Sequence, residues 1–299
     1  MTGSHRAMRQ RTADGGRRTA DGPTTPMICT LRAHLTAAAI ERQFASAGRD
    51  RDRTAVAMLT GRAGELGRSL LASLFTRVPR DHRESAAAIR RRRIVCALTL
   101  VAGTVLLGLS LSLPAGSSLF YPCTVLLAAA WTVGSFASGK VYLGQTPTRR
   151  GDHDAVPIVQ SLALAALLLG VFLVGTVVIA QFSLLRGDVN EVLDHARLGS
   201  LPIVAVITVV NGLAEELFFR GALFSAVPVR HQISVSTLLY LLVTLASGSV
   251  MLAFAAALIG TVVALQRRAT GGVLGPMITH VVWSSGMLFL LPPVLQMTS

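Results

Sequence analysis

Long apolar runs alternate with short polar segments from about residue 94 to the C-terminal end of the chain. A helix of roughly 17–25 apolar residues crosses a hydrocarbon core about 30 Å thick, and most of these runs approach that length. The pattern predicts an all-α fold, a polytopic membrane helix bundle of about seven transmembrane helices. The expected spans are residues 94–113, 119–138, 157–182, 200–227, 232–247, 250–266 and 272–291.

The first 93 residues differ in composition and define a second region. Residues 1–93 hold 19 Arg against 8 acidic residues, a net charge of +11, whereas residues 94–299 hold 9 basic and 7 acidic residues. Low hydrophobicity with high net charge predicts a largely disordered, cytoplasmic N-terminal region. Apolar residues recur at helical spacing between positions 66 and 75. That spacing fits either an interfacial amphipathic helix or a mobile helical linker.

The charge of the N-terminal region indicates the lipid bilayer as its partner, and not a nucleic acid. Anionic headgroups are the natural counter-charge for arginines at a membrane surface. No aromatic interleaving or nucleic-acid motif accompanies the arginines, so no nucleic-acid partner is expected. Cys29, Cys96 and Cys123 are odd in number and lack a Cys-x-x-Cys spacing. Neither a disulfide framework nor a thiolate metal site is therefore expected.

Basic residues between the predicted spans alternate from one side of the membrane to the other. One set of loops carries most of them, and the longest loop of the opposite set, residues 183–199, carries a mixture of signs. The positive-inside rule then predicts a multi-pass cell-membrane protein with a cytoplasmic N-terminus and an outside C-terminus. The first 25 residues contain no apolar run, so the first span is expected to serve as the insertion signal. The basic loop residues are Arg90 to Arg93, Lys140, Arg149, Arg150, Arg230, Arg267 and Arg268.

Two carboxylates and an arginine interrupt the fourth predicted span. Glu215, Glu216 and Arg220 stand where each charge at mid-bilayer costs roughly 2.5–3.5 kcal/mol. Glu216 and Arg220 are four residues apart on one helix face and are expected to form an ion pair. Glu215 points about 100° away, with Asn211 one turn earlier on its own face. This spacing leaves Glu215 to take a proton from water as a general base, and a purely structural polar cluster is the alternative.

His280 is the one histidine deep inside a predicted span, and Ser284 lies one turn later on the same face. At a rise of about 1.5 Å per residue, Glu215 and Ser284 lie roughly 18 Å, and His280 roughly 12 Å, from the cytoplasmic ends of their helices. A glutamate and a histidine that meet in a cavity of low polarity can form a hydrolytic site. The histidine would be a second base, an electrophile or a metal ligand. A membrane histidine can also be only an interhelical hydrogen-bond donor.

These residues resemble the motifs of a known family. Glu215 to Arg220 match the E-E-x-x-x-R motif of the CPBP family, the Abi and CAAX prenyl protease-like intramembrane metalloproteases of bacteria. Residues 266–280, which begin Gln-Arg-Arg and end at His280, are similar to a second stretch of that family. The resemblance covers about residues 200–292. It implies a glutamate-dependent membrane peptidase in which Glu215 activates the water, with Glu216 and Arg220 in support.

Two positions depart from the family's motifs. An F-x-x-x-H motif often follows the glutamates, whereas the best match here ends in Thr244. The last motif is commonly H-x-x-x-N, and here Ser284 replaces the asparagine; its hydroxyl can still donate to a developing oxyanion. The resemblance implies a divalent metal such as zinc, with Glu215 and His280 as its ligands. Catalytic zinc sites usually have three protein ligands, so the departures favour a metal-free general base or an inactive member.

Three functions are therefore open. The first is an intramembrane endopeptidase that hydrolyses membrane-embedded or membrane-anchored substrates with a glutamate-activated water. The second is a catalytically inactive scaffold or immunity-type binding protein of the same fold. The third is a transporter with a glutamate–histidine proton relay, which the absence of a detectable inverted repeat weakens. The candidate site residues are Glu215, Glu216, Arg220, Thr244, His280 and Ser284.

Overall fold

The computed structural model describes residues 84–145 and 157–298, together with part of residues 64–77. Residues 1–63, for which disorder and contact with the membrane surface are expected, lie outside the described residues. Between residues 64 and 75, the described residues are helical, in agreement with their apolar spacing. The described residues from position 64 onward belong to one compact unit, which contains all the elements named below.

Helices make up the described part of the bundle, and no strand occurs in residues 84–145 or 157–298. Among the described residues, six helices are long and apolar enough to cross a membrane, and Val229–Leu245 is a shorter apolar helix. The predicted all-α membrane bundle is thereby confirmed, with six full-length spans and one short one. The six are α2 (Ala86–Ser112), α3 (Phe120–Ser138), α4 (Ile158–Ile179), the continuous helix Leu201–Ala226, α9 (Val250–Thr270) and α10 (Leu274–Met297).

The first span begins earlier than the hydropathy pattern predicted. Helix α2 begins at Ala86, with the Ser85 side chain as its N-terminal cap, so the four arginines lie within the helix. Arg92 is fully buried. Its guanidinium pairs with Glu84 at 2.5 Å and donates to the backbone oxygen of Lys140 at 3.0 Å. A prediction based on apolar residues places the start of the span after the arginines. Arginine is nevertheless a good helix former, and an arginine with a charged partner is tolerated at the end of a transmembrane helix.

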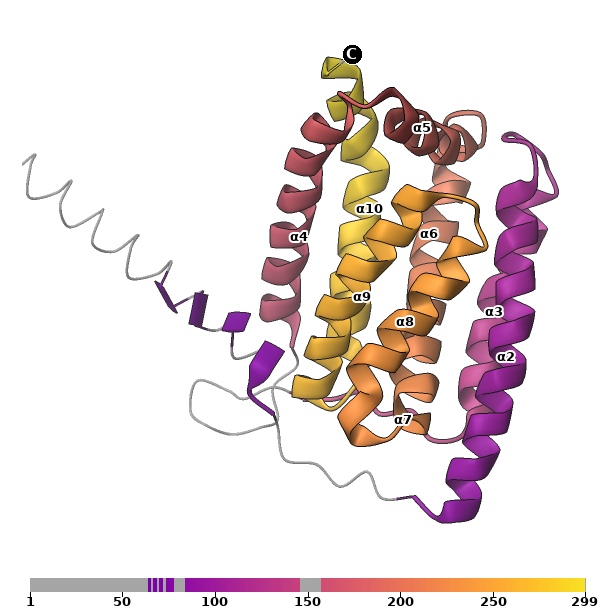
Figure 1. Ribbon diagram of the computed structural model, residues 1–299, viewed down its shortest axis with the longest axis vertical. Coiled ribbons are helices and arrows are strands. Elements are labelled where there is room, and N and C mark those ends of the chain that lie inside the picture. Colours follow the sequence, from indigo (N-terminus) through magenta and orange to yellow (C-terminus); the bar gives the residue numbers. More distant parts are fainter. Residues whose placement is uncertain are drawn as a thin grey trace, which may run out of the picture. The chain divides into compact units, whose positions relative to one another are not determined.

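The loop predicted at residues 183–199 contains a helix. Helix α5 (Ser183–Arg197) lies between α4 and the next span, and its charged residues interrupt the apolar pattern that predicts a membrane-spanning helix. Its apolar side buries Leu193 against Ala180 and Leu295. Figure 1 shows α5 across one end of the bundle, beside the C-terminal end of α10. This helix is amphipathic and caps that end of the bundle.

Three helix pairs pack around the continuous helix Leu201–Ala226. The most extensively packed are α2 with α3, α4 with α10, and α8 (Gln232–Leu245) with α9. Figure 1 shows α4 and α10 on one side, α2 and α3 on the other, and α6, α8 and α9 between them. Trp131 of α3 packs in the centre against Phe218 and Phe219, with ring centroids 4.7 and 5.2 Å away. A Cβ on Gly103 of α2 would overlap the Trp131 ring, so α2 requires a glycine there.

The outer surface of the bundle is apolar. On α2, Leu98, Val101, Val105 and Leu109 are all more than half exposed and recur every three or four residues. This stripe forms an exposed apolar face of α2, of the kind that lipid covers in a transmembrane helix. The chain is therefore a multi-pass membrane protein.

Candidate active site

A change of helix type follows the two glutamates. Helix α6 (Leu201–Glu216) continues into a π-helix at Leu217–Leu223 and then into α7 (Phe224–Ala226). A π-helix is wider than an α-helix and often occurs at functional sites. Two backbone oxygens of this segment accept hydrogen bonds from side chains of neighbouring helices: Phe219 from Ser236 of α8 at 3.0 Å, and Arg220 from Arg267 of α9 at 2.6 Å. The neighbouring helices thus hold the π-helix from two sides.

The ion pair predicted between Glu216 and Arg220 is present. Arg220 Nη1 lies 3.1 Å from Glu216 Oε1, and both side chains are fully buried. Arg220 Nη2 also donates to the backbone oxygen of Gly260 at 3.2 Å. Its guanidinium stacks on the ring of Tyr240, 4.6 Å from the centroid. A second ring, that of Phe219, lies 5.8 Å from the guanidinium, so one carboxylate, one carbonyl and two aromatic rings stabilise the charge inside the bundle.

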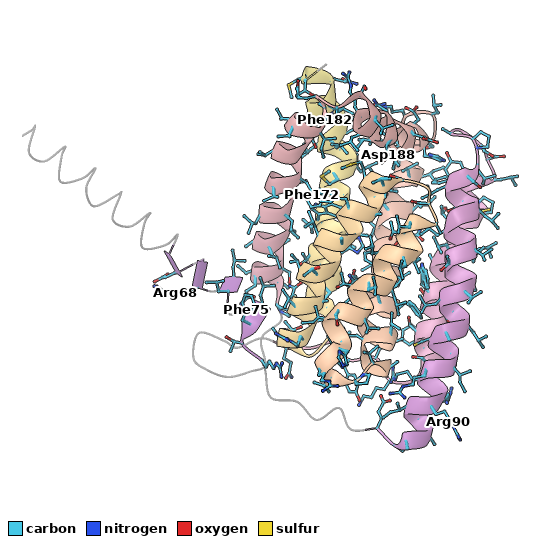
Figure 2. The ribbon with its side chains drawn as sticks, viewed as in Figure 1. Arg68, Phe75, Arg90, Phe172, Phe182 and Asp188 are labelled. Carbon is cyan, nitrogen blue, oxygen red and sulfur yellow. The ribbon has the colours of Figure 1, made fainter. Side chains whose placement is uncertain are left out.

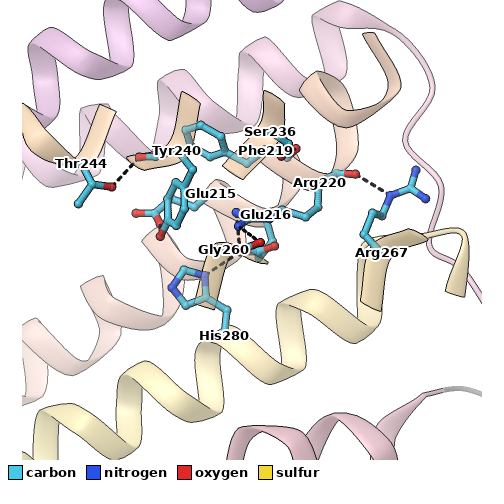
Figure 3. Close-up of polar contacts among 10 residues, drawn as sticks. All are labelled: Glu215, Glu216, Phe219, Arg220, Ser236, Tyr240, Thr244, Gly260, Arg267 and His280. Carbon is cyan, nitrogen blue, oxygen red and sulfur yellow. Dashed lines mark hydrogen bonds and ion pairs between the residues drawn. The ribbon is translucent and has the colours of Figure 1, made fainter. Parts of the chain in front are cut away.

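His280 binds Glu216 directly. The sequence indicated Glu215 as the partner of His280, but the imidazole Nδ1 lies 2.8 Å from Glu216 Oε1. The same oxygen accepts from Arg220, so Glu216 joins the arginine and the histidine (Figure 3). A carboxylate only accepts, so the imidazole Nδ1 donates this hydrogen bond and Nε2 is the nitrogen that Glu216 does not engage. Glu216 thereby orients His280.

Glu215 lies at a cavity. Its Oε2 accepts a hydrogen bond from the hydroxyl of Tyr240 at 2.7 Å. The cavity has a volume of about 250 Å³ and is lined by Glu215, Tyr240, Thr244, His280 and Ser284 among mainly apolar neighbours. Three helices that are distant in sequence thus supply polar groups to one space. Four of the six predicted site residues line it, whereas Glu216 and Arg220 lie behind it.

The hydroxyl and amide groups predicted near the site are engaged locally. Thr244 donates to the backbone oxygen of Tyr240 at 2.8 Å, and Ser284 donates to that of Val281 at 3.2 Å. Each hydroxyl has one hydrogen, so Ser284 must rotate before it can donate to an oxyanion. Asn211 donates to Ile207 of its own helix at 3.1 Å and does not line the cavity. Asn211 thus lies one turn before Glu215 in α6, as expected, but contributes no polar group to the cavity wall.

The donor set does not fit a catalytic zinc ion. No group of three His, Cys, Asp or Glu side chains that could hold a metal occurs in the part of the chain that the structure describes. At the cavity, Glu215 and His280 are the two strong donors, and Thr244 is a weak one. Glu216 is already engaged by an arginine and a histidine. Catalytic zinc usually has three protein ligands, and the two strong donors at this cavity fall short of that set.

Tyr240 is the site residue that sequence reasoning missed. It is the first residue of the stretch that ends at Thr244, and it lies one turn before Thr244 on the same face of α8. That i, i+4 spacing was the available signal. Its importance depends on how α8 faces α6, which the spacing within one helix does not specify.

The fold and the site together define a class: a multi-pass helical membrane protein with a buried acid–arginine–histidine cluster beside a cavity. Within that class, residues 197–286 match the family model of type II CAAX prenyl endopeptidase Rce1-like proteins. This match confirms the resemblance to the CPBP and CAAX protease family, over a segment that runs from the end of α5 into α10. Neither a curated protein nor a solved structure matches the chain.

Proposed function

We propose that this protein is an intramembrane endopeptidase that hydrolyses membrane-associated substrates with a water activated by Glu215. The observation that carries the proposal is the shared cavity of Glu215 and His280, with Glu216 and Arg220 buried behind it. The family match at residues 197–286 supports the reaction class. The assignment of roles to particular residues rests on the geometry of the cavity.

In the proposed reaction, the Glu215 carboxylate takes a proton from water while the water oxygen bonds to the carbonyl carbon of the peptide. The proton then passes from Glu215 to the leaving nitrogen as the C–N bond breaks, which yields a carboxylic acid and an amine. His280, which lines the same cavity, is placed to hydrogen-bond the water or the carbonyl oxygen. Glu216 fixes the orientation of its ring, and Arg220 balances the charge of Glu216. General acid–base assistance of this kind contributes about 10²–10⁴ in rate.

An apolar cavity beside the site supports a membrane-associated substrate. It has a volume of about 430 Å³ and lies among α4, α5, α9 and α10. Its wall shares Leu111, Leu252, Ala255, Trp283 and Ser284 with the wall of the Glu215 cavity. The apolar part of a membrane-anchored substrate could occupy this space while its peptide bond lies near Glu215.

A second candidate function is a catalytically inactive binding protein of the same fold. It is favoured by one specific observation, that the Thr244 and Ser284 hydroxyls both donate to their own helices. In that case the cavity would hold a peptide without cleaving it.

The test is Glu215→Gln in protein reconstituted into liposomes together with a panel of membrane-anchored fluorogenic peptides. We expect the variant to lose cleavage by about 10²-fold or more, because glutamine is isosteric but takes no proton. Glu191→Gln is the matched control, since Glu191 is exposed on α5 outside the cavity. Equal cleavage by wild type and Glu215→Gln would refute the catalytic role of Glu215. Binding of peptides by both proteins without cleavage would support the second function.

A further inference from the structure

Tyr240 makes a contact that neither the motif nor the proposed reaction explains. Its hydroxyl donates to Glu215 Oε2 at 2.7 Å, a length typical of a strong hydrogen bond to a carboxylate. Among the residues that the structure describes, no other side chain donates to the Glu215 carboxylate. Both groups lie at the cavity that holds His280. The hydroxyl therefore has one acceptor, and that acceptor is the proposed general base.

The ring that carries this hydroxyl is held on several sides. The Tyr240 side chain is buried, and its ring lies 4.7 Å from that of Phe219. The Arg220 guanidinium covers one face of the ring, and Arg220 is itself fixed by Glu216 and by Gly260. A Cβ on Gly260 would approach the ring edge to 3.1 Å, so α9 also packs closely against it. A ring with two torsions in such a setting presents its hydroxyl at a defined point.

Packing alone does not account for the hydroxyl. A phenylalanine would fill the same volume and make the same contacts with Phe219 and Arg220. The oxygen of Tyr240 adds only the hydrogen bond to Glu215, and it adds it at the cavity wall (Figure 3). One reading is that two buried polar groups only satisfy each other. The other is that the bond sets the direction of the carboxylate toward a reacting water.

We propose that Tyr240 is a positioning residue, whose hydroxyl holds Oε2 of Glu215 so that Oε1 is directed toward the water in the cavity. This inference rests on the proposed function, because it acts through Glu215. Without the hydroxyl, the carboxylate can rotate and spends less time in the productive direction. Phenylalanine keeps the ring of residue 240 in the cavity wall, so substrate binding is preserved and the loss falls on kcat and not on KM.

The experiment is Tyr240→Phe in the reconstituted cleavage assay. We expect kcat to fall about 10-fold to 100-fold, a loss comparable to that caused by misplaced catalytic groups, with KM within about 2-fold of wild type. Tyr121→Phe is the matched control, because Tyr121 also loses a hydroxyl hydrogen bond, 2.9 Å to the backbone nitrogen of Ser200, but lies outside the cavity. A kcat for Tyr240→Phe equal to that of Tyr121→Phe would overturn the proposal.

A second readout separates positioning from a structural role. Infrared difference spectra should show a carboxyl band of Glu215, identified by its disappearance in Glu215→Gln, that shifts in Tyr240→Phe and not in Tyr121→Phe. A fall in kcat without that shift would assign Tyr240 a structural role and overturn the proposal. If wild type cleaves no peptide, the proposed function fails on its own, while the infrared comparison still tests the contact. An unshifted band would then overturn the positioning role as well.

Discussion

Glu215 and Glu216 are adjacent in sequence and have different partners, because neighbouring positions on a helix point about 100° apart. Glu216 faces the buried side of the bundle, where one of its oxygens accepts from both Arg220 and His280. Glu215 faces the cavity and accepts from Tyr240. The division of the two carboxylates into one supporting and one accessible group therefore follows from helix geometry at residue scale.

The buried pair of Glu216 and Arg220 supports a stability prediction. Arg220→Met should lower the free energy of unfolding by about 3–5 kcal/mol, because it leaves a buried carboxylate without its counter-charge. Glu216→Gln should also destabilise, since it leaves the arginine uncompensated. The double variant should lose less than the sum of the two, because no unpaired charge remains. Unfolding in detergent micelles, followed by circular dichroism, measures all three, and strictly additive losses would contradict the coupling.

Residue-scale reasoning from the sequence was sufficient within one helix and insufficient between helices. The Glu216–Arg220 pair depends only on an i, i+4 spacing and was predicted. The choice of His280 for Glu216, and the contact of Tyr240 with Glu215, depend on how α8 and α10 are rotated about their axes relative to α6. Those rotations result from the packing of many side chains and are not encoded in any single motif.

At the scale of elements, α5 joins two parts of the bundle through a capping interaction. Asp188 of α5 accepts hydrogen bonds from the Ser249 hydroxyl at 3.1 Å and from the Met251 backbone nitrogen at 2.7 Å. Both donors lie at the start of α9, where the first backbone N–H groups have no partner within the helix. The Asp188 carboxylate thus accepts from a backbone N–H group that has no partner within α9. Its negative charge is also stabilised by the positive end of the helix dipole. Figure 2 labels Asp188 and Phe182 at the same end of the bundle.

Asp188→Ala should therefore destabilise the protein by about 0.5–2 kcal/mol, the usual cost of losing a helix cap. Asp194→Ala is the control on the same helix. Asp194 forms a partly exposed pair with Arg197, a kind of pair worth about 0–1 kcal/mol. Thermal unfolding of both variants in micelles makes the comparison. Equal midpoints for the two variants would show that the Asp188 contact contributes nothing beyond a surface charge.

Elements were predictable from the sequence to the extent that they are apolar. The runs at residues 119–138 and 250–266 correspond to α3 and to most of α9, because lipid-facing helices must consist of apolar side chains. The first turns of α2 and the whole of α5 were not predicted from apolar runs, because both carry charged side chains that are paired or exposed. Amphipathic and charged helices at the ends of a bundle are stabilised by contacts that hydropathy does not measure.

At the scale of the whole molecule, charge is segregated between the two ends of the bundle. The start of α2, the end of α9 and the Val229–His231 turn carry basic residues at one end, where Figure 2 labels Arg90. The opposite end carries α5, with both signs of charge, and the C-terminal end of α10. The loop pattern read from the sequence thus corresponds to two physical ends of one bundle. On the positive-inside rule, we propose that the basic end faces the cytoplasm.

This assignment predicts which positions a membrane-impermeant reagent reaches. In a variant with its three native cysteines replaced, Glu191→Cys on α5 should react with an impermeant maleimide in intact cells, because α5 would lie outside. Arg230→Cys, also exposed but at the basic end, should react only after the membrane is permeabilised. The two positions control for each other, since both side chains are accessible to water and differ only in the side of the membrane. Labelling of Arg230→Cys in intact cells, with Glu191→Cys protected, would reverse the orientation. The α5 end, and with it the apolar cavity that α5 lines, would then open toward the cytoplasm, which would change the side from which a membrane-anchored substrate approaches Glu215.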